Sequence, residues 1–445
     1  YIGGVLEMVE SPKESEKTPT PPKKKSTTMW ISVIIVIIVI IAVVGVVMYE
    51  QTPTKKPVTA PADILIGTLY ASTGSFATSS MPEYDGLMLW ASQVNAQGGI
   101  YVSSYGEKLK VKIISYDDSS DPTTAETDYN ELITVNNVNF LVADFGSVLT
   151  APAVSLAESH HVLLFDVTGS SASFFATPSP YIVLTSIPGS PAYAKYGAPQ
   201  LLSLGITKVA VAYAENDFTT PLQQVFVSAL EAGGVTPVYD QGFPTSTTDF
   251  TSIITTIESY NPQAVIFYGY PSDDIPFMNQ LHSLGVHFPY LFTIFPGQLF
   301  TLMEQAVGSN MTYTFTYAFP PLIKFPNINY GMNLTALESI WNSTYPSVPF
   351  GYLSVAGYNA GLIIQDAITT AGSLNATAVR SAINTISGTI TTVDGLFEVN
   401  TTTGMQIGET PPIGQVVPNG SGGLKVNIVY PSSLANAAPI YPAPS

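Results

Sequence analysis

The chain has 445 residues, of which 46% are hydrophobic and only 11% are charged. A chain of this length usually exceeds one hydrophobic core, so two lobes or domains are expected, and the composition is too apolar for a disordered protein. From Ala62 onward eight basic residues stand against twenty-seven acidic ones, a net charge near −19 that argues against nucleic acid as a partner. The sequence has no cysteine and no metal-binding spacing of its four histidines, so we expect neither disulfides nor a metal or cofactor site.

The first sixty residues predict attachment to a membrane. The run from Met29 to Tyr49 is uncharged, and at about 1.5 Å per residue a helix of this length spans a hydrocarbon core of ~30 Å. It is either a transmembrane helix or the apolar part of a signal. Residues 1–28 form a short basic, proline-rich tail whose Lys23–Lys25 favour a cytoplasmic side, and residues 50–61 are typical of an extended stalk. The remainder of the chain is therefore expected outside the cell.

Six Asn-x-Ser/Thr sequons agree with an exterior location and are candidate glycosylation sites. They lie at Asn310, Asn333, Asn342, Asn375, Asn400 and Asn419. A chain rich in Ser and Thr produces some sequons by chance, so they support the location without deciding it.

From Asp63 onward short apolar strands alternate with helical segments. The first strand, Asp63–Tyr70, leads through a turn at Ser72–Ser75 to a helix over Tyr84–Gln97. Further strands are expected at Lys110–Tyr116, Phe140–Ala143, Val162–Phe165, Val209–Tyr213, Ala264–Tyr268 and Tyr290–Thr293. This alternation predicts an α/β fold with parallel sheets and helices on both faces, and such sheets bind ligands at the carboxyl ends of their strands.

The segments that follow these strands carry hydroxyls, glycines, aromatic rings and a few acids. They are residues 72–75, 146–150, 166–171, 215–219, 269–274 and 294–297. Such groups suit hydrogen bonding and stacking with a small polar solute. They supply no nucleophile paired with a base and no glycine-rich phosphate loop, so we expect a binding protein and not an enzyme.

Several sequence motifs, in the same order along the chain, resemble those of the type I periplasmic binding proteins, the Leu/Ile/Val-binding group in particular. They are the opening run Ile66–Ile100, the acidic phrase Tyr116–Pro122, Gly146–Ala153 and the late helix Val355–Gly372, within a match from about Asp63 to Val429. The resemblance implies two αβα lobes with parallel sheets, joined by three crossovers near Thr185, Thr316 and Val393. It places residues 62–184 and 317–392 in lobe 1, residues 185–316 and 393–434 in lobe 2, and residues 435–445 in a tail.

The N-terminal segment carries a resemblance of its own. A basic tail, then Ser26 and an unbroken apolar helix, is similar to the class III signals of archaeal sugar-binding proteins. Together the two resemblances imply an archaeal, membrane-anchored substrate-binding protein that traps a solute between its lobes and presents it to ABC permease subunits. A receptor ectodomain is the alternative; an extracellular hydrolase and a surface-filament scaffold are less favoured.

The resemblance also implies ligand-binding residues. Ser147 corresponds to the hydroxyl that holds a ligand carboxylate, Thr168 to a backbone contact and Ser170 to a second hydroxyl. Phe218 and Tyr270 correspond to aromatic positions of the second lobe. Asp166 and Ser75 follow first-lobe strands and complete the candidate set. Each has an alternative role: the serines and Asp166 as helix caps or turn residues, and the aromatic residues as hinge or core packing.

One departure from the family pattern bears on the ligand. Amino-acid binders of the group carry an acid after the strand that corresponds to Tyr290–Thr293, where this chain has Ile294-Phe295-Pro296. A buried ammonium without a partner would cost several kcal/mol. Either Asp166 or Asp217 compensates, or the ligand is an amide, a urea-like compound or an aromatic acid. The acidic trio Asp117, Asp118 and Asp121 is expected to form a turn and cap the next helix instead of binding calcium, because it lacks the glycine and final Glu of an EF-hand loop.

Overall fold

The structure is a computed structural model that describes residues 34–44 and 59–444. Residues 34–44 are helical, and their apolar side chains are exposed. They belong to a different structural unit from the globular part, which begins at Thr59. Within the described ranges, no helix is both long and apolar enough to cross a membrane. The remaining residues of the expected span 29–49, the tail 1–28 and most of the stalk lie outside the described residues.

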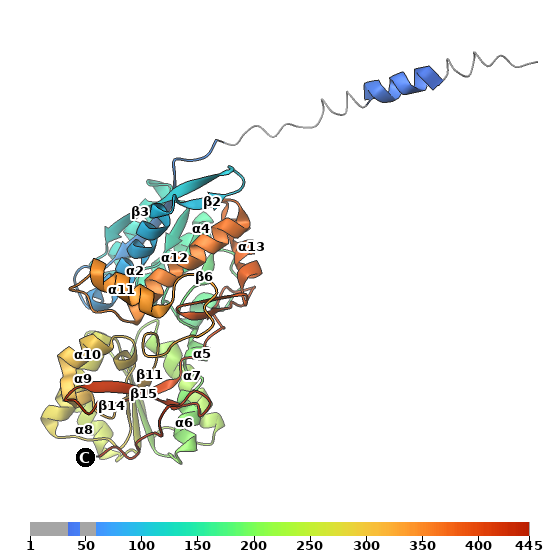
Figure 1. The fold of residues 1–445 in the computed structure, drawn as a ribbon. Helices are drawn as coiled ribbons and strands as arrows, with labels where there is room; N and C mark the ends of the chain where they lie inside the picture. Colours follow the sequence, from blue (N-terminus) through green and yellow to red (C-terminus); the bar gives the residue numbers. More distant parts are fainter. Residues whose placement is uncertain (1–33, 45–58, 445) are drawn as a thin grey trace, which may run out of the picture. The chain divides into compact units, whose positions relative to one another are not determined.

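The globular part contains two α/β lobes, each built around its own sheet (Figure 1). The sheet of lobe 1 has the strand order β2-β3-β1-β4-β5-β6, and only the β2–β3 pair is antiparallel. Its strands are β1 (Asp63–Tyr70), β2 (Ile100–Val102), β3 (Glu107–Asp117), β4 (Phe140–Val142), β5 (Leu163–Asp166) and β6 (Ile182–Leu184). Its helical segments are α2 (Ala77–Ala96), α3 (Pro122–Thr134), α4 (Gly146–His160), η1 (Ala172–Phe175), α11 (Leu334–Thr344), α12 (Tyr352–Ala371) and α13 (Ala376–Ile386).

The sheet of lobe 2 has the order β15-β14-β11-β10-β9-β7-β8; β14 is antiparallel to both of its neighbours, β11 and β15, and the other pairs are parallel. Its strands are β7 (Val209–Ala214), β8 (Tyr239–Phe243), β9 (Ala264–Tyr268), β10 (Leu291–Phe292), β11 (Phe315–Tyr317), β14 (Ile413–Pro418) and β15 (Leu424–Tyr430). Its helical segments are α5 (Ser190–Tyr193), α6 (Gly197–Ser203), α7 (Thr219–Ala232), α8 (Thr251–Ser259), α9 (Pro271–Leu284), η2 (Phe295–Gly297), α10 (Phe300–Val307) and η3 (Gly308–Met311). Parallel sheets covered by helices agree with the predicted α/β class.

The chain changes lobe three times. The first change follows β6, and the second follows β11. The third comes later than the expected position near Val393, because the hairpin of β12 (Ile390–Thr392) and β13 (Gly395–Phe397) and the residues after it stay with lobe 1. There the backbone N–H of Leu184, on the edge strand of that sheet, donates to the carbonyl oxygen of Gly404. The chain enters the second sheet only at Ile413.

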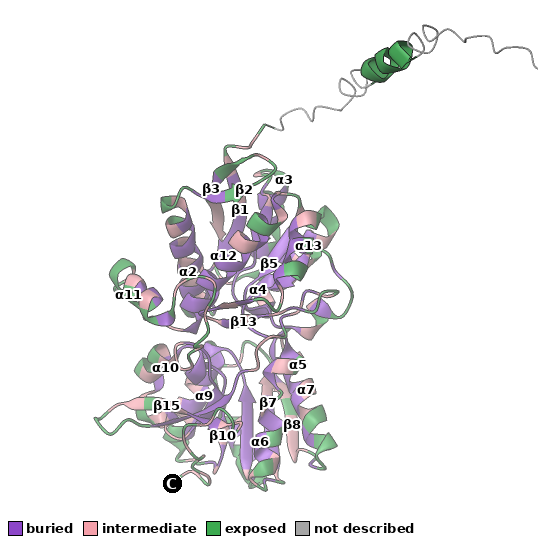
Figure 2. Ribbon diagram, turned by 45° about the vertical axis from the view of Figure 1, so that its right-hand side comes forward, coloured by how far each residue is buried: buried purple, intermediate pink, exposed green. Residues whose placement is uncertain are grey.

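Burial follows the layers of both lobes (Figure 2). Strands β5 and β9 are buried along their whole length, as expected for central strands covered on both faces. In lobe 1, α2 packs directly on α12, and α3 packs on α4. These contacts hold the starts of α2 and α4 in place beside the ends of β1 and β4, where the candidate site lies.

Candidate functional site

The first-lobe part of the site is the N-terminus of α4. The helix begins at Gly146, whose φ of +74° favours glycine, and the Ser147 side chain that follows is fully buried. The hydroxyl of Thr168 accepts the N–H of Gly146 at 2.9 Å and donates to Oε2 of Glu83 on α2 at 2.8 Å. The hydroxyl of Ser147 accepts the N–H of Ser171 at 3.1 Å. The start of this fifteen-residue helix is thus fixed from two sides, and its free N–H groups and dipole favour an anion there.

Ser170 and Asp166 lie beside this helix start, at the end of β5. Both side chains are fully buried. The Ser170 hydroxyl has no hydrogen-bond partner within the described part of the chain. One carboxylate oxygen of Asp166 accepts the N–H of Gly169 at 2.7 Å, and the other has no described partner. Burial raises the pKa of Asp166 well above its ordinary value, and the side chain closes a turn through the N–H of Gly169.

Aromatic rings from both lobes meet the helix start. Tyr270, the residue that caps α9 of lobe 2, has its ring centroid 4.9 Å from that of Phe76 and 5.8 Å from that of Phe145, both in lobe 1. From its own lobe it contacts Phe218 at 5.3 Å and Phe295 at 5.9 Å. These distances lie within the normal range for aromatic pairs, so the two lobes are joined here by an aromatic cluster.

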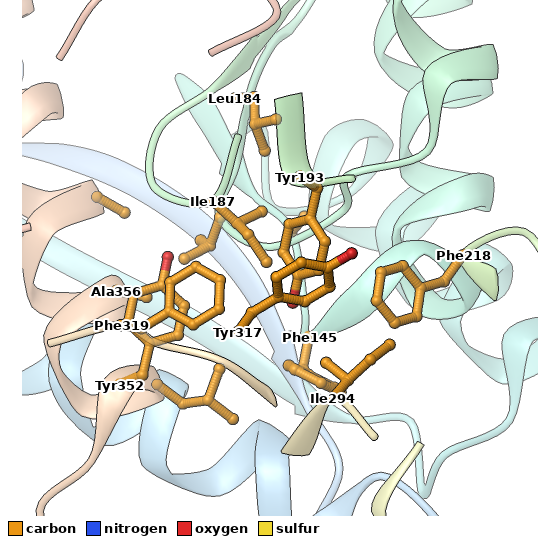
Figure 3. Packing of buried hydrophobic residues seen from close by; sticks show 14 of the residues in the cluster. Phe145, Leu184, Ile187, Tyr193, Phe218, Ile294, Tyr317, Phe319, Tyr352 and Ala356 are labelled. Atoms are coloured by element: carbon orange, nitrogen blue, oxygen red, sulfur yellow. The ribbon is translucent and has the colours of Figure 1, made fainter. Parts of the chain in front are cut away.

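This cluster continues toward the connections between the lobes (Figure 3). The figure shows Phe218, Tyr193 and Tyr317 as neighbours, with Phe145 close to them and Phe319 and Tyr352 farther along. The ring of Tyr193 lies 4.6 Å from that of Tyr317 and 6.0 Å from that of Phe218. Its hydroxyl accepts a hydrogen bond from the amide nitrogen of Gln298.

The space that remains between these side chains is small, a cavity of about 10 Å³. Its lining comes from both lobes and consists of Phe145, Gly146, Thr168, Ile187, Phe218, Tyr270, Phe295 and Gln298. Three of the seven candidate ligand residues, Thr168, Phe218 and Tyr270, line this cavity, and Ser147 is adjacent in sequence to its wall. Ser170 and Asp166 lie just outside the lining. Ser75 is exposed before α2, whereas the next residue, Phe76, is buried against Tyr270.

Residues outside the candidate set also belong to the site. Asp274, on the first turn of α9, is fully buried and accepts the N–H of Phe295 at 3.1 Å, while its second oxygen has no described partner. It therefore brings a carboxyl to the place where the segment after β10 supplies none. Burial raises the pKa of Asp274 and of Glu83 well above their ordinary values. Glu83 could have been found as an acid within an otherwise weakly charged helix; Phe76 and Phe145 carry no such signal.

Two buried acids, Asp144 and Asp118, lie next to the start of α4. Asp144, two residues after the end of β4, accepts the hydroxyl of Ser80 at 2.5 Å and the N–H of Phe145 at 2.6 Å. Burial and the nearby charge of Asp144 raise the pKa of Asp118 to about 8, and burial raises that of Asp144 to about 6. The other two acids of the trio act locally: Asp121 caps α3 through the N–H of Thr124, and Asp117 accepts the N–H groups of Ser72 and Ser119.

Two α/β lobes, with strand ends and a helix N-terminus of one lobe packed against aromatic residues of the other, define the class of two-lobed solute-binding proteins. The chain belongs to the periplasmic binding protein family, whose sequence profile matches residues 63–416. The resemblance to type I members of this family is thereby confirmed. The chain is 24% identical over 336 residues to "Leu/Ile/Val-binding protein homolog 7" of Brucella abortus (strain 2308). This match covers 74% of this chain and 82% of that protein.

Solved structures share the fold at low sequence identity. A leucine-binding protein of Thermotoga maritima superposes with a TM-score of 0.68 at 16% identity, over 82% of this chain and 97% of that one. The branched-chain amino acid binding protein of Streptococcus pneumoniae, in complex with isoleucine, gives 0.68 at 18% identity, over 83% and 100%. A solute-binding protein of Rhodopseudomonas palustris BisB5, in complex with 3,4-dihydroxybenzoic acid, gives 0.69 at 17% identity, over 86% and 99%.

Proposed function

We propose that this protein is the extracellular, membrane-anchored solute-binding component of an ABC importer. The observation that carries the proposal is the α4 N-terminus of lobe 1, with Gly146 and Ser147, set against aromatic side chains of lobe 2. A helix N-terminus favours a carboxylate or carbonyl, and surrounding aromatic rings favour an apolar body. Closure of such lobes on a solute is the hinge motion by which these folds present cargo to a permease.

The solute is a small organic molecule whose carboxylate or carbonyl lies near Ser147 and Ser170, and it is not held mainly through an ammonium group. The segment Ile294–Pro296 offers no carboxylate, and the buried Asp166 already accepts the N–H of Gly169, while burial disfavours its charged form. Isothermal titration calorimetry with carboxylates, amides and amino acids, on the wild type and on Ser147→Ala, tests this. A solute bound through its carboxylate loses affinity in the variant, whereas equal affinity in both proteins contradicts the assignment.

An α-amino acid is the second candidate solute, and Asp274 is the observation that favours it. This buried carboxyl has one oxygen without a described partner and contacts the backbone of Phe295. The names of the relatives point the same way. If leucine or isoleucine binds and Asp274→Asn or Asp166→Asn abolishes binding, that acid holds the ammonium group and the solute is an amino acid.

The membrane anchor rests on the uncharged run Met29–Tyr49 and the polar stalk after it. We expect the protein to fractionate with membranes and to be digested by protease added outside intact cells. Recovery in the cytosolic fraction would contradict the anchor and the exterior location together.

The proposed exterior location makes the sequons testable. The side-chain oxygens of Asn400 and Asn419 accept backbone N–H groups in exposed turns, and no described contact engages their amide nitrogens. The amide nitrogen of Asn310 instead donates to the side chain of Asn279 at 3.1 Å. Mass spectrometry of the native protein should find glycans at Asn400 or Asn419 before Asn310, and the reverse order would contradict this ranking.

A further inference from the structure

The side chain of Tyr270 reaches out of lobe 2 to the helix start of lobe 1. Its backbone N–H is fixed by the carboxylate of Asp273 at 2.8 Å, and only 3% of the residue is exposed. A Cβ atom placed on Gly146 would lie 2.8 Å from the Tyr270 hydroxyl. The hydroxyl faces the N–H groups of Ser147 and Val148, which oppose the burial-driven rise of its pKa, although neither group reaches good hydrogen-bond geometry. The phenol oxygen therefore occupies the anion-favouring end of α4.

The ring of Tyr270 is surrounded by aromatic side chains in the way expected for a bound aromatic ligand. It makes edge-on contacts with Phe76 and Phe145 from lobe 1, with interplanar angles of 79° and 69°. Phe218 and Phe295 from lobe 2 meet it at tilted angles of 42° and 34°. Rings from both lobes thus surround a single planar ring whose polar group points at a helix N-terminus.

The volume beside this ring is too small for a solute. The remaining cavity of about 10 Å³ is about the space of one water-sized probe. A solute that uses the α4 N-terminus must therefore displace the Tyr270 side chain. Because a competing side chain reduces the binding-competent fraction, it lowers the apparent affinity by that fraction.

We propose that the phenol of Tyr270 occupies the solute position between the lobes, and that the solute which displaces it is of the same kind, a single planar ring with a hydroxyl or carboxylate head group. This inference rests on the proposed solute-binding function. Among the cavity-lining residues none carries a positive charge, so the head group is received by the N–H groups of Ser147 and Val148 at the start of α4. The ring takes the place of the tyrosine ring among the four phenylalanines.

The experiment removes the Tyr270 ring by mutation and adds a small aromatic acid that can take its place. The full-length protein and its Tyr270→Ala variant are titrated calorimetrically with benzoate and 4-hydroxybenzoate, and with leucine and isoleucine as solutes that lack a ring. We expect one benzoate to bind per Tyr270→Ala molecule, at least about 10-fold more tightly than to the wild type, because the competing ring is gone. Tyr290→Ala is the matched control: it truncates another fully buried tyrosine, stacked on Phe315 within lobe 2, and should gain no benzoate affinity.

A second variant keeps part of the packing of the cluster. Tyr270→Leu removes the aromatic ring but keeps a buried apolar side chain, so it should raise the affinity for benzoate by about 5- to 10-fold because the competing ring is gone. It decides the question if Tyr270→Ala does not fold. If neither variant gains benzoate affinity while the wild type binds leucine or isoleucine, the inference is wrong and the proposed function stands. If the Tyr270 variants bind benzoate but the wild type binds no solute, the aromatic site around Tyr270 is supported and the proposed function is contradicted.

Discussion

Hydroxyls around the start of α4 differ in what they already bind. Thr168 bridges Gly146 and Glu83, and Ser147 accepts the N–H of Ser171, but the buried Ser170 hydroxyl has no partner within the described structure. A buried hydroxyl without a partner lowers stability, so such a group is retained at a cost. Binding a solute is the role that would account for Ser170.

Replacing Ser170 with Ala should separate binding from folding. The variant loses no hydrogen bond that its side chain makes in the structure, so its free energy of unfolding should be unchanged or higher. Its affinity for the solute should fall by about 1–3 kcal/mol, the cost of leaving a polar group of the solute unpaired. Chemical denaturation and calorimetric titration measure the two quantities. Ser147→Ala is the comparison, since it should lower both; a Ser170→Ala variant that binds normally would remove Ser170 from the site.

Some candidate site residues could be predicted because they lie close after strands. Ser147, Thr168 and Tyr270 all lie within five residues of a strand end, where parallel sheets place ligand contacts, and the resemblance to the periplasmic binding proteins assigns each a role. The contacts of Tyr270 with Phe76 and Phe145 could not be predicted, since they depend on how the two lobes meet. Asp274 lies in the strand-end segment 269–274, but its contact with the Phe295 backbone could not be predicted, because the two residues follow different strands.

At the scale of elements, α2 and α12 pack at very close range. A Cβ atom on Gly357 would lie 1.8 Å from the backbone oxygen of Glu83, and one on Gly361 would lie 2.1 Å from the ring of Trp90. Gly357 is required because backbone atoms cannot move aside, and Gly361 because the buried ring of Trp90 fills the space beside it. The position of Glu83, and through Thr168 that of the α4 start, depends on this packing.

We expect Gly357→Ala to destabilise the protein by about 1–3 kcal/mol or more, because overpacking a helix interface forces the helices apart. Gly351→Ala is the control, since its Cβ would meet its nearest neighbour, the Gln298 oxygen, at an ordinary 3.4 Å. Urea denaturation of both variants measures the difference. Equal stability of the two variants would show that the helices are not held at the distance described.

Element boundaries were predictable where the apolar pattern sets them. The expected helix from Tyr84 begins seven residues earlier, at Ala77, because its first turns bury the polar Ser79 and Ser80. The hydroxyl of Ser80 accepts the N–H of Ala71 and donates to the carboxylate of Asp144, so this polar stretch faces the lobe interior. The late third crossover depends on backbone pairing between Leu184 and Gly404, which leaves no side-chain pattern.

For the whole molecule, buried acids link stability to pH. Asp118 has a pKa of about 8, and Asp144 and Asp273 have pKa values of about 6, against an ordinary Asp value near 4. Between about pH 4 and 8 the folded state therefore binds more protons than the unfolded state. The free energy of unfolding must then fall as pH rises through this range.

We expect a higher melting temperature at pH 5 than at pH 8. Asp118→Asn should flatten the profile between pH 6 and 8 and raise stability at pH 8, because a neutral amide replaces a buried group that must ionise. Asp121→Asn is the matched control: Asp121 lies at the surface, and asparagine also caps helices, so the slope should not change. Melting curves recorded from pH 4 to 9 test this, and a melting temperature that rises toward pH 8 would contradict it.

Capture of one small organic solute between the two lobes is tested most directly by a thermal-shift screen. The purified protein is screened against amino acids, amides, carboxylates, aromatic acids and sugars, and the hits are titrated calorimetrically. We expect one chemical class to bind at one site per molecule and to stabilise the fold by about 2.7 kcal/mol at a hundred times its Kd. A broad panel in which no compound raises the melting temperature would contradict it.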